Sequence, residues 1–131
     1  MHNRNNVKAL QNFSIFENTK MWLDIYFDNQ IPPFTPPLKA TGSSFALSVW
    51  EILLKIPYGK SSTYGAIAKI IATQRGLKKM SAQAVGGAVG ANPIAIIIPC
   101  HRVIGSNGTL TGYAGGLDIK KKLLEIEGFK L

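Results

Sequence analysis

Apolar residues recur at helical spacing near the start of the chain, where Trp22, Ile25 and Tyr26 share one face. This period predicts a helix over about residues 19–28, with Asn29 as its stop. The residues before it are polar and show no clear period, so the predicted structure begins with this helix.

The next segment, residues 31–38, contains two proline pairs. Proline fixes its own φ and restricts the residue before it, so we expect an extended connector here. A proline motif bound by a partner protein is the alternative. We therefore interpret residues 1–41 as an N-terminal segment and connector, and residues 42–131 as the main domain.

Four more helices are predicted by a polar cap followed by apolar residues at helical spacing. They are Phe45–Lys55 after Ser43 or Ser44, a helix from Thr63 through about Ala72, a short helix of small residues after Ser81, and a helix after Asp118 that faces the core with Ile119 and Leu123 and ends at Gly128. The second and third of these, with the basic loop between them, have the outline of a helix-turn-helix.

A short hairpin completes the predicted fold. Ser106-Asn107-Gly108 is a turn sequence between Val103-Ile104 and Thr109-Leu110, which we expect to pair as strands. The predicted class is mainly α (α+β): a small helical domain with a winged-helix-like helix-turn-helix and a short hairpin, preceded by an N-terminal helix and a proline-rich connector.

Two adjacent glycines, Gly86 and Gly87, lie inside the predicted short helix. Each costs about 1 kcal/mol relative to alanine, so the pair needs a compensating gain. The gain is either tight packing against another helix or close approach of the helix backbone to a ligand.

Composition places the chain among globular proteins, since 46% of its 131 residues are hydrophobic. No apolar run approaches the roughly 18 residues of a membrane span, so we expect no membrane association. The first residues carry no signal-peptide pattern, and the single cysteine suits a reducing compartment; both favour a cytoplasmic protein.

The formal charge is +8, and no acidic residue occurs between Glu51 and Asp118. That interval holds seven basic residues: Lys55, Lys60, Lys69, Arg75, Lys78, Lys79 and Arg102. The distribution points to a polyanionic partner, most plausibly nucleic acid. A surface that only aids solubility is the alternative.

Cys100 is the only cysteine, so it cannot form an intramolecular disulfide or a thiolate cluster for a metal. It is either a buried spectator or a nucleophile assisted by a base. Pro99 interrupts strand pairing directly before it, which favours presentation of the thiol on irregular backbone.

His101 is the candidate base, although a purely structural histidine is the alternative. On an extended backbone its side chain would point away from Cys100, so a bridging water is the simpler geometry. A carboxylate would hold the histidine tautomer, and the sequence leaves Asp118, Glu125 and Glu127 open for that task.

The segment Ile98–Ile104, with the sequence IPCHRVI, resembles the signature of O6-alkylguanine-DNA alkyltransferases. The resemblance covers about residues 20–128 and continues through Ile56–Lys60, Thr63–Gly65, Ala84–Ala88, Asn92-Pro93, Gly112–Gly116 and Leu123–Gly128. It implies a single irreversible turnover in which an O6-alkylguanine flipped out of duplex DNA gives its alkyl group to Cys100. Whether O4-alkylthymine is also repaired stays open.

The resemblance also implies a role for each matching residue. His101 deprotonates the thiol through water, and Glu127 orients His101. Asn92 ties the helix-turn-helix to the active-site loop, and Tyr64 donates a proton to the guanine N3. The residues implied to bind the substrate are Tyr64, Pro93, Val103, Tyr113 and Ala114. The residues expected to bind DNA are Tyr64, Ser81, Ala82, Gln83, Ala84, Gly86 and Gly87, with the second helix of the helix-turn-helix in the minor groove. Lys60, Lys78 and Lys79 are expected to contact phosphates because of their charge.

Two departures from the family pattern are visible. Many members have an arginine at the position of Gln83, which fills the space of the flipped base. Members usually carry a separate N-terminal domain, so the resemblance implies that residues 1–41 are a truncated form of it, without the zinc ligands found there in some members. No cofactor or metal and a monomeric state are expected.

Two other functions compete with this one. Alkyltransferase-like proteins bind lesions without removing the alkyl group, but they replace the cysteine that this chain has at position 100. A plain helix-turn-helix regulator would leave the block around Cys100 unexplained.

Overall fold

The computed structural model describes residues 15–113 and 115–131. Contacts divide the chain into two compact units, Met1–Lys39 and Ala40–Leu131. In the described residues, no helix is both long and apolar enough to cross a membrane.

The first unit contains helix α2, Ile15–Phe27. Within it the rings of Trp22 and Tyr26 stack, with their centroids 5.2 Å apart. The helix begins earlier than predicted, since Glu17 places a negative charge in a first turn that favours it. Asn29 follows the helix with a φ of 58°, which confirms it as the stop.

The second unit contains three consecutive helices, α3 (Ser44–Leu54), α4 (Tyr64–Gln74) and α5 (Ala82–Gly90). Each is capped by the side chain of the preceding residue, which accepts a hydrogen bond from a backbone N–H three positions on. The caps are Ser43 to Ala46 N at 3.1 Å, Thr63 to Ala66 N at 3.0 Å and Ser81 to Ala84 N at 3.2 Å. The predicted caps are confirmed.

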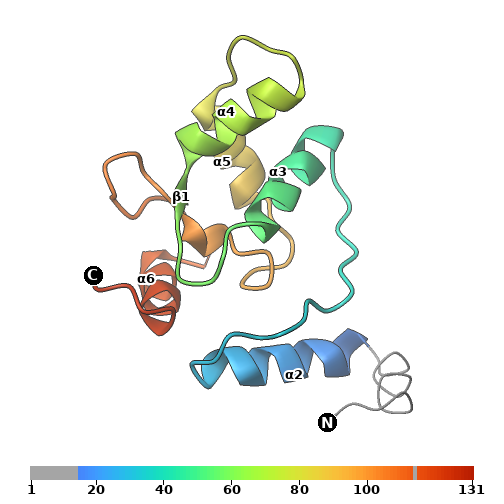
Figure 1. Cartoon of the computed structure of the whole chain (residues 1–131), viewed down its shortest axis with the longest axis vertical. Coiled ribbons are helices and arrows are strands. Elements are labelled where there is room, and N and C mark those ends of the chain that lie inside the picture. The colour runs from blue at the N-terminus through green and yellow to red at the C-terminus, as the bar shows by residue number, and fades with distance from the viewer. Residues whose placement is uncertain (1–14, 114) are drawn as a thin grey trace. The chain divides into compact units, whose positions relative to one another are not determined.

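Helices α3, α4 and α5 pack on one another around an apolar core (Figure 1). The fully buried side chains at this centre are Val49, Leu53, Ile67, Ile71 and Val85. Trp50 adds a directional contact, because its indole N–H donates to the Ala88 carbonyl across 2.9 Å. The predicted helix-turn-helix outline of α4 and α5 is therefore present and braced by α3.

The sheet is a two-stranded parallel bridge between β1 (Ser62–Thr63) and β2 (Val103–Ile104). Ser62 pairs with Val103 and Thr63 with Ile104. The predicted hairpin is wrong in its second strand. A turn does form: Gly108 N–H donates to the Gly105 carbonyl, and Gly105 N–H donates to the Thr109 carbonyl, both at 2.9 Å. Thr109-Leu110 forms no strand beyond this turn, and β2 pairs with β1 instead.

The short 3₁₀ helix η1 (Cys100–Arg102) and helix α6 (Leu117–Ile126) complete the second unit. Gly116, at a φ of 98°, is the N-cap of α6, so the predicted Asp118 cap is wrong; Asp118 is the second residue of the helix and lies in its first turn. Gly128, at a φ of 97°, follows the helix as predicted. Ile119 is exposed and the neighbouring Lys120 is fully buried, the reverse of the pattern expected from hydrophobicity.

Candidate active site

Two tight turns in the segment that follows α5 position Cys100. The Asn92 amide donates to the Ile98 carbonyl at 2.8 Å and accepts from Ile94 N–H at 2.9 Å, so it holds both ends of the intervening loop. Pro99, at φ −82° and ψ 65°, forms an inverse γ-turn that Cys100 N–H closes on Ile98 at 2.8 Å. Cys100 therefore begins the 3₁₀ turn as a buried thiol.

His101 follows Cys100 on this 3₁₀ turn, so the extended backbone expected for the pair is wrong. With three residues per turn, adjacent side chains diverge by roughly 120°, and the imidazole still points away from the thiol. It points into a buried cluster, where Nε2 lies 2.6 Å from Glu127 Oε2. Of the three candidate carboxylates, Glu127 is the one the fold brings to His101.

Arg102 completes this cluster, and sequence reasoning missed it. Its Nε donates to Glu127 Oε1 at 2.8 Å and its Nη2 to Oε2 at 3.1 Å, a forked pairing that fixes the carboxylate plane. The Gly59 N–H also donates to Oε1, at 3.0 Å. The available signal was an arginine two residues after Cys100, close to the end of an apolar run, since a buried guanidinium requires a carboxylate.

Burial controls the protonation states of the resting pair. It raises the pKa of the Cys100 thiol above 9.0, although contacts with Asn92, Lys120 and Tyr113 act in the opposite direction. It also lowers the pKa of His101 below 6.5, partly offset by the hydrogen bond and negative charge of Glu127. At neutral pH the site therefore holds a neutral thiol and a neutral imidazole able to accept its proton.

Lys120 is a second residue missed from the sequence. Its buried ammonium donates to the carbonyls of Val103 at 2.5 Å and Thr111 at 2.7 Å, with Gly112 at 3.4 Å. Desolvation lowers its pKa, and the negative charge that Cys100 carries when ionised raises it. The side chain thus joins β2 to the glycine-rich segment and adds positive charge near the sulfur.

A cavity of about 240 Å³ lies beside Cys100. It is lined by Val89, Gly90, Asn92, Ala95, Ile96, Cys100, Gly112, Tyr113, Gly115 and Ile119. Burial and the neighbouring Cys100 raise the pKa of Tyr113 to about 12, so its hydroxyl stays protonated. The volume is below the roughly 300 to 1,000 Å³ of sites for drug-sized ligands and suits a single flat ring system.

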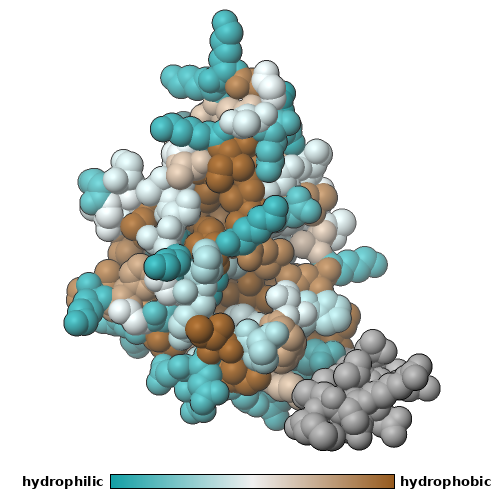
Figure 2. Space-filling model, viewed as in Figure 1, coloured by the Kyte–Doolittle hydropathy of each residue, from teal (hydrophilic) through white to brown (hydrophobic). Residues whose placement is uncertain are grey.

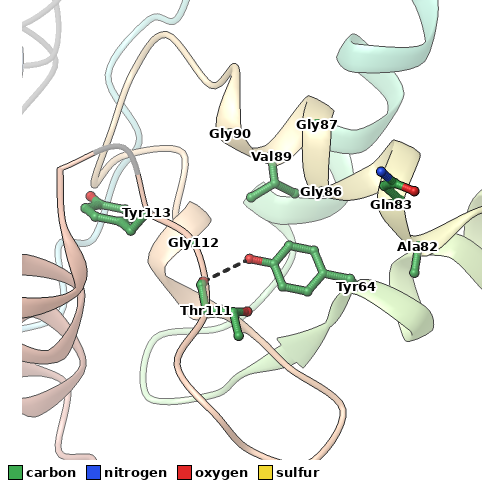
Figure 3. Close-up of a pocket in the computed structure, with 10 residues that line it drawn as sticks. All are labelled: Tyr64, Ala82, Gln83, Gly86, Gly87, Val89, Gly90, Thr111, Gly112 and Tyr113. Carbon is green, nitrogen blue, oxygen red and sulfur yellow. Dashed lines mark hydrogen bonds between the residues drawn. The ribbon is translucent and has the colours of Figure 1, made fainter.

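A larger open pocket of about 740 Å³ adjoins this cavity, because both are lined by Val89, Gly90, Gly112 and Tyr113. Figure 3 shows Tyr64 between α5 and the 111–112 segment, with its hydroxyl donating to the Thr111 carbonyl at 3.2 Å. Gln83 lies on the α5 side of the same pocket. The two hollows together lead from the surface of α5 to the thiol.

The paired glycines of α5 line the open pocket. A Cβ at Gly87 would meet nothing within 4 Å, and one at Gly86 would meet only the Tyr64 ring, at 3.8 Å. Helix packing therefore does not require either glycine. Of the two explanations for the pair, close approach of a ligand to the helix backbone fits this geometry.

Two of the predicted substrate-binding residues, Pro93 and Val103, do not line the cavity or the open pocket. Pro93 is exposed and lines neither hollow, and Val103 is buried in β2 and takes part through its carbonyl. Ala114 lies outside the described residues.

The predicted DNA-contacting residues outside the pocket are solvent-facing. They are Lys60, Lys78, Lys79, Ser81 and Ala84, whereas Ala82 is exposed and also lines the open pocket. Figure 2 shows hydrophilic side chains projecting from the segment between α4 and α5. In the described parts of the chain, no group of three or more His, Cys, Asp or Glu residues is arranged to hold a metal.

Comparison with known proteins places this site in context. Residues 44–129 match the family model described as "6-O-methylguanine DNA methyltransferase, DNA binding domain". A methylated-DNA–protein-cysteine methyltransferase of Methanosarcina acetivorans is 48% identical over 91% of this chain and 73% of its own length. The Haemophilus influenzae protein of the same name is 43% identical over 86% of this chain and 61% of its own length.

Solved structures agree with these matches. The crystal structure of Mycobacterium tuberculosis OGT in complex with DNA aligns with a TM-score of 0.75 and 47% identity, over 86% of this chain and 66% of that one. The S. pombe Atl1 structure in complex with damaged DNA containing O6-carboxymethylguanine aligns with a TM-score of 0.54 and 36% identity, over 70% of this chain and 82% of that one.

Proposed function

The chain belongs to the 6-O-methylguanine DNA methyltransferase family, and from this premise we propose that it repairs duplex DNA by moving an alkyl group from guanine O6 to Cys100 in one irreversible turnover. The observation that carries the proposal is the position of Cys100. This buried thiol lines a cavity that adjoins the pocket along α5. The next residue, His101, is also buried and contacts the Glu127 carboxylate.

The reaction begins with loss of the thiol proton. Burial keeps the resting thiol protonated, and His101 is neutral at pH 7, so His101 accepts the proton through a bridging water. The thiolate then attacks the alkyl carbon, an S–C bond forms, and the C–O bond breaks with its electron pair going to guanine O6. Tyr64 donates a proton to guanine N3, so that the leaving base departs neutral.

Glu127 and Arg102 act on this reaction through His101. The carboxylate fixes the imidazole by its contact with Nε2, so proton transfer from the thiol side uses Nδ1. The forked Arg102 pairing holds the carboxylate in place and balances its charge when His101 is neutral. The imidazolium that forms during transfer is stabilised by the negative charge at 2.6 Å.

We propose that α5 enters the minor groove of DNA. Its small residues let the helix backbone approach, and Gln83 fills the space that the flipped base leaves, without the charge of the usual arginine. The net charge of +8 and the exposed Lys60, Lys78 and Lys79 supply phosphate contacts. Flipping the base costs a few kcal/mol, which Tyr64 offsets by crowding the phosphate behind it.

We assign residues 42–131 to the DNA-binding catalytic domain, because all the residues of the site lie there. We also propose that the protein acts as a monomer, without a cofactor, in the cytoplasm, where a reducing environment keeps Cys100 free to react.

The deciding experiment is peptide mass spectrometry after incubation with duplex DNA containing O6-methylguanine. The Cys100 peptide should gain one methyl group in stoichiometric amount, whereas undamaged duplex and the Cys100→Ser variant should give no gain. Tight binding to the lesion with an unmodified Cys100 would instead identify an alkyltransferase-like lesion-binding protein.

A further inference from the structure

Ile96 has an unusual backbone conformation, with a φ of 72°. Of the non-glycine residues in the described ranges, Asn29 also has a positive φ, but asparagine adopts this conformation readily at the end of a helix. A β-branched residue does not, because its Cβ substituents collide with the backbone. Ile96 is therefore held in a strained state.

The surrounding loop fixes this strain in place. Ile97 N–H bonds the Ala95 carbonyl at 2.8 Å, which closes a γ-turn of the rare kind with positive φ at its central residue. Ile98 N–H bonds the Ile94 carbonyl at 3.1 Å around it, and the Asn92 amide holds both ends of the loop. A strained residue persists where its neighbours over-determine it, and such residues cluster at functional sites.

The Ile96 residue borders the cavity that contains Cys100. Ala95, next to it, and Ile119, from α6, also contribute apolar lining, while Tyr113 and Gly115 belong to the glycine-rich segment. A glycine or asparagine at position 96 would form the same turn with less strain. The turn therefore does not explain why a large aliphatic side chain lines the cavity at this position.

We propose that Ile96 is a specificity-determining residue that limits the size of the alkyl group transferred to Cys100. This inference rests on the proposed alkyl transfer. The strained turn holds aliphatic bulk beside the sulfur, where a methyl group fits and a longer chain collides. Because the loop is tied at both ends, Ile96 cannot retreat from a longer alkyl group as an exposed side chain would.

The test compares single-turnover rate constants on duplexes with O6-methylguanine and O6-butylguanine. The Ile96→Gly variant removes the side chain and suits the positive φ, so the loop should keep its shape. Its butyl-to-methyl rate ratio should rise roughly tenfold or more over wild type, since a few methylenes in a pocket discriminate by that amount. Ile96→Ala should shift the ratio in the same direction, and thermal melting checks that both variants fold.

Ile70→Ala is the matched control for the Ile96→Ala variant, since it removes the same aliphatic bulk from an exposed residue of α4 that does not line the cavity. The ratio should change far less in this variant. An equal rise there, or an unchanged ratio in Ile96→Gly, would overturn the inference. If wild type transfers no methyl group, the proposed function itself fails, which is a separate result from either of these.

Discussion

Replacing Glu127 with alanine tests the buried cluster behind the active site. The carboxylate is fully buried and accepts hydrogen bonds from Arg102 Nε, Arg102 Nη2 and Gly59 N–H, while its Oε2 also contacts His101 Nε2. Alanine leaves the Arg102 guanidinium buried without its carboxylate, although Nη1 still donates to the Ile56 carbonyl at 2.8 Å.

The expected loss follows from the unpaired charge. Breaking a buried ion pair by removing one partner costs about 3–5 kcal/mol of the free energy of unfolding. For a domain of this size, the corresponding fall in Tm is roughly 10 to 25 °C. The measurement is urea unfolding followed by circular dichroism, with Tm from a thermal scan as a second readout.

Glu125→Ala is the control, because Glu125 lies exposed on the same helix, and its free energy of unfolding should stay within about 0.5 kcal/mol of wild type. The double variant Arg102→Met/Glu127→Ala removes both charges and should recover part of the loss. If Glu127→Ala costs no more than Glu125→Ala, the forked pairing does not stabilise the fold and the reasoning is wrong.

Three further outcomes are expected. Cys100→Ala should abolish alkyl transfer but keep DNA affinity, measured by fluorescence anisotropy, because phosphate contacts supply most of it; a large loss of affinity would contradict this division. The slope of log affinity against log salt should be steep and become shallower by about 2 in Lys78→Ala/Lys79→Ala, and a flat series would remove DNA as the partner. Burial lowers the pKa of His101 below 6.5, so the unfolded state binds more protons just below that pH; the free energy of unfolding should therefore fall as pH drops below 6.5. In His101→Asn this part of the decline should disappear, and an identical decline would assign it to other groups.

Features that depend on near neighbours in the chain could be predicted from the sequence. Ser43, Thr63 and Ser81 cap their helices through hydrogen bonds that span three residues, so the local sequence contains both partners. The turn around Asn107 was predicted for the same reason. The second strand predicted at Thr109-Leu110 does not form, and Val103 pairs instead with Ser62, which lies far away in the sequence.

The residues of the active site also could be predicted only where they are close together in the sequence. Cys100 and His101 were identified from adjacent residues, but the choice of Glu127 from the residues alone stayed open until the resemblance indicated it. Lys120 was invisible to hydrophobic patterning, because a lysine is buried only where carbonyls from separate segments converge on it. The strain at Ile96 was equally hidden, since local preferences argue against a positive φ for isoleucine.

The parallel bridge between β1 and β2 has a mechanical consequence. It joins Thr63, where α4 starts, to Ile104, just past the 3₁₀ turn that begins with Cys100. The helix-turn-helix and the segment containing Cys100 are thus joined by backbone pairing as well as by the chain itself. Under the proposed function, this pairing links the start of the helix-turn-helix directly to the segment that carries the thiol.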